Sequence, residues 1–179
     1  PRGVRVWLLT VGDPLPIFDG GSPCLFRTGL LAGVLRARRH EVTWWTSAFV
    51  HYGKRHRVYA DTAATREGGE SRSLRPVGYR RNLSLSRFVE RTGVARKFAK
   101  QARSRPPPDV ILASLPTIEL AHRAVRFGLA NDVPVIVDIR DLWPDVLLNV
   151  LPRSIRWTGR IALHWLMVKA RFVLQRCSG

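Results

Sequence analysis

The stretch VDIRDLWPD, at positions 137–145, brings three acids, one guanidinium and one indole into a short run. These side chains are Asp138, Arg140, Asp141, Asp145 and Trp143. The apolar residues Val133, Val135 and Ile136 come just before it and predict a buried strand. A strand that simply ended at the surface would not need such a set of side chains. We therefore interpret the stretch as a candidate catalytic or binding cluster at the carboxyl end of a central strand.

The elements that would position this cluster alternate between strands and helices along the whole chain. β-rich apolar runs predict strands at residues 4–10, 41–47, 109–114 and 133–139, with a further short strand near 74–77. Apolar spacing predicts helices at about 22–39, 84–104, 118–130 and 154–177. The first helix is expected to bury Phe26, Leu30, Val34, Leu31 and Leu35. The alternation predicts an α/β, Rossmann-like domain with a mostly parallel sheet and helices on both faces.

Polar residues follow each of the four main strands. The exits hold Gly12 and Asp13 after the first strand, Thr46 and Ser47 after the second, Ser114, Pro116 and Thr117 after the third, and 138–145 after the fourth. In an open parallel sheet, ligands bind in the crevice outside the carboxyl ends of the strands. Because four polar exits would converge on one such edge, we predict a binding site there.

The loop DGGSP, at positions 19–23, could bring a phosphate close to the backbone. Gly20 and Gly21 have no side chain to block a ligand, and a helix starting at Ser22 would offer free N–H groups and a positive dipole end. The loop is neither G-x-G-x-x-G nor G-x-x-x-x-G-K-[ST], which disfavours dinucleotide oxidoreductases and P-loop enzymes. An ordinary glycine turn before a helix is the alternative.

Two basic segments could form anion-binding lips beside the crevice. The segment HYGKRHR holds His51, Lys54, Arg55, His56 and Arg57, and the segment GYRRN holds Arg80 and Asn82. The alternative is a solvated basic loop, which is the usual role of a run of charges. The two histidines have no carboxylate partner in the run, and DIRD is not a D-x-D arrangement, so no metal site is predicted.

The chain of 179 residues is strongly basic, with 30 Lys and Arg against 13 Asp and Glu and a net charge of +17. Such a surface attracts polyanions, although an arginine-rich coding bias could also produce it. A hydrophobic content of 45% supports a packed core. Cys24 and Cys177 fit a reducing cytosol, and no apolar run reaches the length of a membrane span. Because the chain starts without Met and stops just after an apolar helix, we expect a fragment of a longer protein.

Four segments together resemble the N-terminal domain of family 4 glycosyltransferases. They are GDPLPIFDGGSP with FRTGLLAGVL, HEVTWWTSAFVHYGKRHR, DVILASLPTIELAHRA and VPVIVDIRDLWPD. The branch they resemble is the bacterial one that builds exopolysaccharide and O-antigen repeats on polyprenyl diphosphate. The resemblance covers most of the chain and is weakest at residues 58–74. Its most specific parts are RDLWPD and the Gly-Gly loop.

The resemblance implies one half of a GT-B fold, in which two Rossmann-like domains face each other across a cleft. Residues 1–179 would be the N-terminal, acceptor-side domain, and the C-terminal domain that holds the nucleotide-sugar would be absent. It implies a retaining, hexosyltransferase-type enzyme that needs no metal or cofactor besides its nucleotide-sugar co-substrate, and a fragment that is inactive alone. Its partners would be a lipid-linked saccharide acceptor and an anionic membrane, in the cytoplasm at the inner face of the plasma membrane.

The resemblance also suggests roles for single residues. Arg140 and Asp141 fall at the cleft floor, where Arg140 replaces a histidine found in many members and Asp141 would orient a sugar hydroxyl. Gly20, Gly21 and Ser22 would approach the donor phosphates. The acceptor side would use Asp13, His51, Lys54, Arg55, Arg57, Arg80, Asn82 and Ser114. Asp138 would be a structural partner of neighbouring backbone, and Trp143 with Pro144 would shape the turn.

Two basic helices are candidates for membrane contact. The helix at 154–177 lacks acids and carries Trp157, Ile161 and Trp165, yet packing on the sheet or on the absent domain is its favoured role. The helix at 84–104 is the preferred candidate because it carries many basic residues and a single acid, Glu90. The basic residues are Arg87, Arg91, Arg96, Lys97, Lys100, Arg103 and Arg105.

Two other functions compete with sugar transfer. A basic nucleic-acid-binding module fits the charge, but the chain has no helix-turn-helix, zinc-finger or RNA-binding aromatic signature, so no specific nucleic acid is predicted. Trp44 and Trp45 lie in an expected strand and belong to the core. The second competitor is another GT-B-like enzyme, such as a sugar-nucleotide epimerase.

Overall fold

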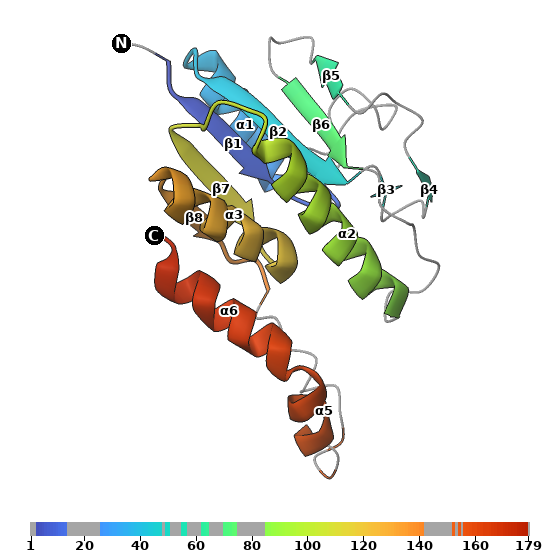
Figure 1. Cartoon of the computed structure of the whole chain (residues 1–179). Coiled ribbons are helices and arrows are strands. Elements are labelled where there is room, and N and C mark those ends of the chain that lie inside the picture. The colour runs from blue at the N-terminus through green and yellow to red at the C-terminus, as the bar shows by residue number, and fades with distance from the viewer. Residues whose placement is uncertain are drawn as a thin grey trace.

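The computed structural model describes residues 3–13, 26–47, 49–50, 55–56, 62–64, 70–74, 85–141, 152, 154 and 156–178. It shows one sheet with helices in front of it and behind it (Figure 1). No helix within these ranges combines the length and the apolar character that crossing a bilayer requires.

Six strands form the sheet, in the order β5-β6-β2-β1-β7-β8. They are β1 (Arg5–Leu9), β2 (Glu41–Ser47), β5 (Thr62–Ala64), β6 (Glu70–Leu74), β7 (Val110–Ser114) and β8 (Val135–Asp138). All neighbours pair in parallel except β5 and β6. The chain builds outward from β1 to β6, then returns to place β7 and β8 on the other side of β1. This order confirms the predicted Rossmann-like class and puts a topological switch point between β1 and β7.

Helices cover both faces of the sheet. They are α1 (Arg27–Ala37), α2 (Leu85–Ala102), α3 (Ile118–Asn131), α5 (Arg156–Ala162) and α6 (His164–Arg176). In Figure 1, α2 and α3 lie side by side in front of the strands, α6 packs against α3, and α1 lies behind. The short strands β3 (Phe49–Val50) and β4 (Arg55–His56) form a separate antiparallel pair.

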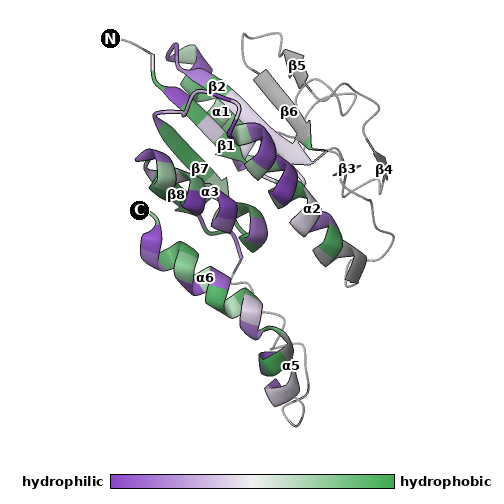
Figure 2. Ribbon diagram, in the orientation of Figure 1, coloured by the Kyte–Doolittle hydropathy of each residue, from purple (hydrophilic) through white to green (hydrophobic). Residues whose placement is uncertain are grey.

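The core has one cluster on each face because side chains alternate along the strands. Along β1, Trp7 and Leu9 point to the cluster under α2 and α3, whereas Val6 and Leu8 point to the cluster under α1. Trp45 packs edge-on against both Trp7 and Phe98, with ring centroids 5.1 Å apart in each pair. Trp44 and Trp45 are fully buried, as the sequence predicts. The helices differ from this apolar core, because α2, α3 and α6 carry both hydrophilic and hydrophobic residues (Figure 2).

The first helix differs from its prediction in the face that it buries. Leu30 and Val34 are 58% and 50% exposed. The buried row instead contains Thr28 and Ala32, whose small side chains let the helix lie close to the sheet. Leu31 and Leu35 are partly buried against the same cluster. The expected burial of Leu30 and Val34 is therefore wrong.

Three other elements depart from their predicted positions. β6 spans Glu70–Leu74 rather than 74–77, because a strand with polar side chains gives little apolar signal. β8 is the end strand of the described sheet, not a central one, and Ile136 is 43% exposed. The predicted helix at 154–177 is divided at Leu163, where the sequence has neither Pro nor Gly to announce a break.

Candidate functional site

The exits of three adjacent strands meet at the carboxyl edge of the sheet. Asp13 follows β1 after Gly12, whose φ of 97° is one that glycine adopts without strain. Ser114 ends β7, and Asp138 ends β8. Asp13 and Ser114 are each 5% exposed. Asp13 and Ser114 are therefore buried at the switch point beside the partly buried Asp138, which agrees with the predicted convergence for three of the four strand exits.

Arg140 joins the three exits. Its Nη1 donates to both carboxylate oxygens of Asp13 at 2.9 Å, and its Nε donates to Oδ2 of Asp138 at 2.8 Å. Its Nη2 donates to Oγ1 of Thr28 at 2.5 Å and to Oγ of Ser114 at 3.4 Å. All three guanidinium nitrogens are thus engaged by the protein, and the side chain is only 20% exposed. The long arginine side chain spans the end of β7 to link β8 with β1.

Hydroxyl groups fill the space beneath the guanidinium. Oγ1 of Thr10 lies 3.0 Å from Oγ1 of Thr28 and donates to Oγ of Ser114 at 3.3 Å. The Ser114 hydroxyl also donates to Oδ2 of Asp138 at 3.4 Å. Because Thr10 and Thr28 are almost fully buried, this network fixes the start of α1 against the ends of β1 and β7.

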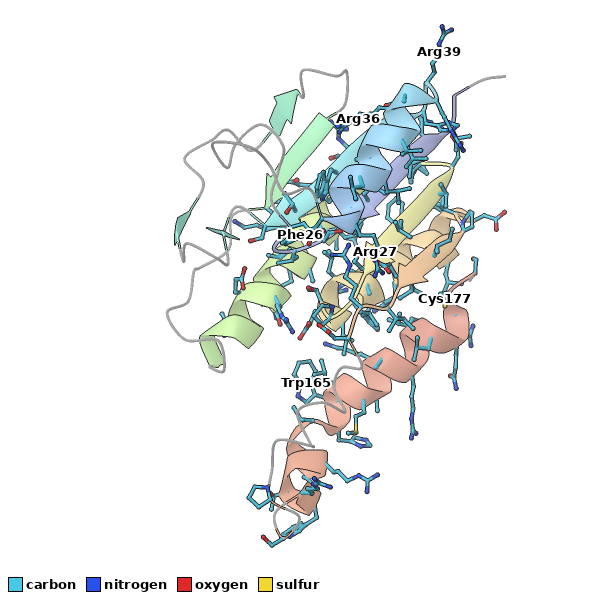
Figure 3. All side chains as sticks on the ribbon, turned by 180° about the vertical axis from the view of Figure 1, so that it is seen from behind. Phe26, Arg27, Arg36, Arg39, Trp165 and Cys177 are labelled. Carbon is cyan, nitrogen blue, oxygen red and sulfur yellow. The ribbon has the colours of Figure 1, made fainter. Side chains whose placement is uncertain are left out.

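A second arginine balances the charge of the cluster. Nη1 of Arg27, the first residue of α1 (Figure 3), donates to Oδ1 of Asp138 at 2.5 Å. Two carboxylates, Asp13 and Asp138, therefore face two guanidinium groups. Arg27 differs from Arg140 in being 67% exposed, so it presents positive charge to solvent at the crevice.

The ion pairs keep the cluster charged. Partial burial alone would raise the pKa of Asp138, but hydrogen bonds from Arg140 and Arg27 outweigh it and hold that pKa below its ordinary value. Burial alone would lower the pKa of Arg140, but hydrogen bonds from Asp138 and Asp13 raise it. Asp138 and Arg140 therefore form a fixed pair of charges at neutral pH, which suits positioning rather than proton transfer.

Asp141 lies next to this cluster but has a different environment. It sits at a bend and is exposed. Its position leaves the carboxylate accessible to a ligand at the carboxyl edge. Of the two residues predicted at the cleft floor, Arg140 is thus held by protein groups, whereas Asp141 faces solvent.

A cavity of about 350 Å³ opens beside the cluster, between α1 and β8. Arg27, Asp138 and Arg140 form its polar end. Its walls include the apolar side chains of Leu31 and Ile136. The exposure of Ile136 follows from this cavity, because no helix covers that part of β8 among the described residues. A ligand with a charged end and an apolar body would match this lining.

The exit of β2 joins a different buried group. Oγ of Ser47 donates to Oε1 of Glu90 on α2 at 3.2 Å, and Glu90 is fully buried. The neighbouring Arg91 is 4% exposed and donates from Nη1 to the carbonyl of Pro116 at 3.4 Å. Arg91 is therefore not available for the membrane contact that the sequence predicts for this helix, since the charges of Glu90 and Arg91 both lie in the interior.

Several predicted site residues lie outside the described part of the chain. They are Gly20, Gly21, Ser22, His51, Lys54, Arg57, Arg80 and Asn82, together with Trp143, Pro144 and Asp145. Arg55 pairs through its backbone with Val50 in the small β3–β4 ladder. The predicted helix start at Ser22 lies outside the described residues; within them, α1 begins at Arg27, after Phe26 in an extended conformation.

The sequence prediction misses Arg27, Thr28 and Thr10 as members of the cluster. Two of these lie in the FRTG segment, five residues or more after the Gly-Gly loop, where no motif marks them. The expectation that Asp138 bonds neighbouring backbone is also wrong, because its carboxylate accepts from two arginines and one serine. The sequence does contain a signal for the contact between Asp138 and Arg140. Their D-x-R spacing places both side chains on the same side of an extended chain.

No protein-family model and no curated protein sequence matches the chain. Among the solved structures to which its fold is similar is "Crystal Structure Analysis of the Glycotransferase of kitacinnamycin", with 18% sequence identity and a TM-score of 0.46. The similarity covers 96% of this chain and 37% of that protein, so the chain spans a little over a third of its length. At this distance the likeness assigns no activity to the chain.

Proposed function

We propose that the chain is the acceptor-side half of a retaining, metal-independent glycosyltransferase. The whole enzyme would move a sugar from a nucleotide-sugar to a polyprenyl-diphosphate-linked acceptor in exopolysaccharide or O-antigen synthesis. It would work in the cytoplasm at the inner face of the plasma membrane. The observation that carries the proposal is the fixed charge cluster that the arginine of RDLWPD builds at the switch point, where open α/β sheets bind their ligands.

In this proposal, Arg140 is a positioning residue. Its guanidinium ties Asp13 and Asp138 together and so fixes the floor of the crevice before a ligand arrives. A preorganised floor lowers the entropy cost of aligning two substrates, which is a large part of catalysis in bimolecular transfer. Asp141, adjacent and exposed, would accept a hydrogen bond from the acceptor hydroxyl and orient it toward the sugar.

Arg27 would contribute to anion recognition at the same crevice. Its exposed guanidinium stands at the start of α1, beside the cavity whose lining combines a charged end with apolar walls. A diphosphate attached to a lipid offers the matching chemistry, since guanidinium groups pair well with phosphate oxygens. The donor domain would supply the nucleotide-sugar from the opposite side of the cleft.

In the transfer itself, the bond between the anomeric carbon and the diphosphate oxygen breaks, and a bond to the acceptor oxygen forms. The proton of the acceptor hydroxyl passes to the departing diphosphate oxygen, and the nucleoside diphosphate leaves with it. The test uses the full-length protein with candidate nucleotide-sugars and a lipid extract of bacterial membranes. Release of nucleoside diphosphate that depends on the extract is the expected result. Epimerised nucleotide-sugar formed without extract, or no reaction with any donor, would refute the proposal.

A further inference from the structure

The helices α5 and α6 carry a row of exposed apolar side chains. Trp157, Ile161, Trp165 and Val168 are 63%, 68%, 41% and 51% exposed. At about 100° per residue, their spacing of four, four and three residues places them within an arc of about 80°. Trp165 projects from the first turn of α6 (Figure 3), and α5 extends away from the sheet (Figure 1).

The row continues across the junction between the two helices. The N–H of Leu163 donates to the carbonyl of Gly159 at 2.9 Å, and the N–H of Met167 donates to the carbonyl of Leu163 at 3.0 Å. These i to i−4 bonds carry the chain across the junction in a near-helical course, although Leu163 itself forms the turn that separates α5 from α6. The four side chains therefore form one stripe, which we call the Trp stripe.

The Trp stripe lies opposite the face that packs on the domain. The buried residues of the two helices are Gly159, Leu166, Ala170 and Val173. The same helical rotation centres them about 150° from the stripe. Leu166, Ala170 and Val173 belong to the main core cluster, where α6 meets α3. The helix pair thus has two apolar faces, of which one already has its partner.

Basic residues border the stripe, and residues 156–178 contain no acid. Lys169 and Arg176 fall on one side of it and Arg160 and Arg171 on the other, at about 20–60° from its edges by helical rotation. Nζ of Lys169 lies 4.5 Å from the centroid of the Trp165 ring. An apolar strip with tryptophans and flanking cations is the pattern of a helix that lies in the plane of a membrane interface.

We propose that the Trp stripe docks the protein onto an anionic membrane surface. The tryptophan and aliphatic side chains would enter the boundary between headgroups and acyl chains, and the flanking cations would contact anionic headgroups. The charge favours this partner, because residues 156–178 carry five cations and no acid: Arg156, Arg160, Lys169, Arg171 and Arg176. Such a segment repels a basic protein surface and attracts anionic lipid. The net charge of +17 adds a long-range attraction of the same sign.

The stripe lies at the functional end of the domain. The N–H of Ser178 donates to the carbonyl of Val135 at 2.7 Å, so α6 ends at the start of β8. α6 therefore runs back along β8, and its first turn and α5 lie toward the carboxyl edge, where Asp138 and Arg140 are. Docking would bring the crevice to the bilayer, which is where a lipid-linked acceptor would be found. This last step rests on the proposed function.

The basic surface of α2 is a weaker candidate. Its exposed cations, Arg96, Lys97 and Lys100, lie in its second half. The second half of α2 lies toward the amino edge of the sheet. The chain that follows it reaches Asp109, whose carboxylate accepts from the N–H of Arg5 at the start of β1 at 2.7 Å. Within residues 89–102, the part of α2 whose side chains the structure describes, the one large exposed apolar side chain is Val89. A membrane bound there would face away from the crevice and would be held by charge alone.

The test is cosedimentation of the full-length protein with vesicles, with no nucleotide-sugar or acceptor present. Vesicles of phosphatidylcholine are compared with equimolar phosphatidylcholine and phosphatidylglycerol. The double variant Trp157→Ala with Ile161→Ala should bind the anionic vesicles at least about tenfold more weakly, because it removes the side chains that would be inserted. The matched control, Val34→Ala with Leu129→Ala, removes equally exposed apolar side chains elsewhere and should bind like the wild type.

Two results would overturn the proposal. One is equal binding of the wild type to neutral and anionic vesicles. The other is wild-type binding by the double variant; if that variant also melts at a lower temperature, the stripe instead packs against another part of the protein. Sugar transfer is not part of this assay, so its outcome is independent of whether the protein proves to be a glycosyltransferase.

Discussion

Nη1 of Arg140 donates to both carboxylate oxygens of Asp13 at 2.9 Å, although the two residues are 127 positions apart in the chain. The contact joins the exit of β8 to the exit of β1 over the end of β7. It links β1 and β8, the first and last parallel strands along the chain, at the carboxyl edge of the sheet.

Replacing Arg140 should destabilise the whole domain. Arg140→Ala leaves the carboxylate of Asp13 buried without this partner, and breaking a buried ion pair costs about 3 kcal/mol of unfolding free energy. Urea denaturation measures the cost. The control Arg103→Ala removes an exposed arginine and should stay within about 0.5 kcal/mol of the wild type. Equal stability of the two variants would contradict the structural role of Arg140.

The ion pairs of Asp138 predict how stability depends on acid. Because its pKa is lowered in the folded protein, the unfolded chain takes up a proton first as the pH falls. The stabilisation is present above the ordinary aspartate pKa and is lost as the pH falls through the lower native value. Asp138→Asn should therefore be less stable at neutral pH and should lose less stability between about pH 5 and pH 2. Parallel curves for variant and wild type would count against these pairs.

His122 predicts a second pH effect, at the contact between α3 and α6. Burial lowers its pKa, and the charges of Lys169, Arg126 and Arg123 lower it further. The neutral ring, whose centroid lies 5.1 Å from that of Phe172, is thus the folded form. Stability should fall as the pH drops below about 6.5, because the unfolded chain binds the proton more readily.

The variant His122→Gln tests this effect. Its unfolding free energy should change less than that of the wild type between about pH 7.5 and pH 5. His164→Gln, which removes an exposed histidine at the start of α6, should keep the wild-type slope. A wild-type slope in His122→Gln would show that another group is responsible.

Two helical glycines should respond to alanine in opposite ways. At Gly33 a Cβ would meet no atom within 4 Å, so Gly33→Ala should stabilise α1 by up to about 1 kcal/mol through helix propensity. At Gly128 a Cβ would lie 2.5 Å from the carbonyl oxygen of Val133, so Gly128→Ala must push α3 away from β8. Melting temperatures should rise for the first variant and fall for the second. The same sign in both would contradict the packing of these helices.

The sequence predicts the elements whose apolar pattern is strong. β1, β2 and β7 are rich in branched and aromatic residues, and Trp44 and Trp45 are placed correctly in the core. β6 escapes prediction because four of the five residues in ESRSL are polar, and its place is set by pairing with β2. Local pattern cannot reveal a strand that depends on its neighbour.

The candidate site shows the same limit. The convergence of Asp13, Ser114 and Asp138 follows from parallel strands, because their carboxyl ends share one edge. Which residue Arg140 contacts depends on strand order, since only the adjacency of β1, β7 and β8 puts Asp13 within its reach. Arg27 and Thr28 reach the charge cluster because the buried residues of α1 are small and let that helix approach the sheet closely. No sequence motif encodes this approach.

The most direct measurement compares turnover of the full-length protein with that of Asp141→Asn and of a matched control. The control is Asp132→Asn, at the C-terminal end of α3. It removes an exposed carboxylate, and asparagine tolerates the left-handed backbone conformation of this position. If Asp141 orients the acceptor hydroxyl, extract-dependent release of nucleoside diphosphate should fall about a hundredfold in Asp141→Asn, with unchanged melting temperature. It should stay at the wild-type level in Asp132→Asn. Wild-type turnover in Asp141→Asn would contradict the account.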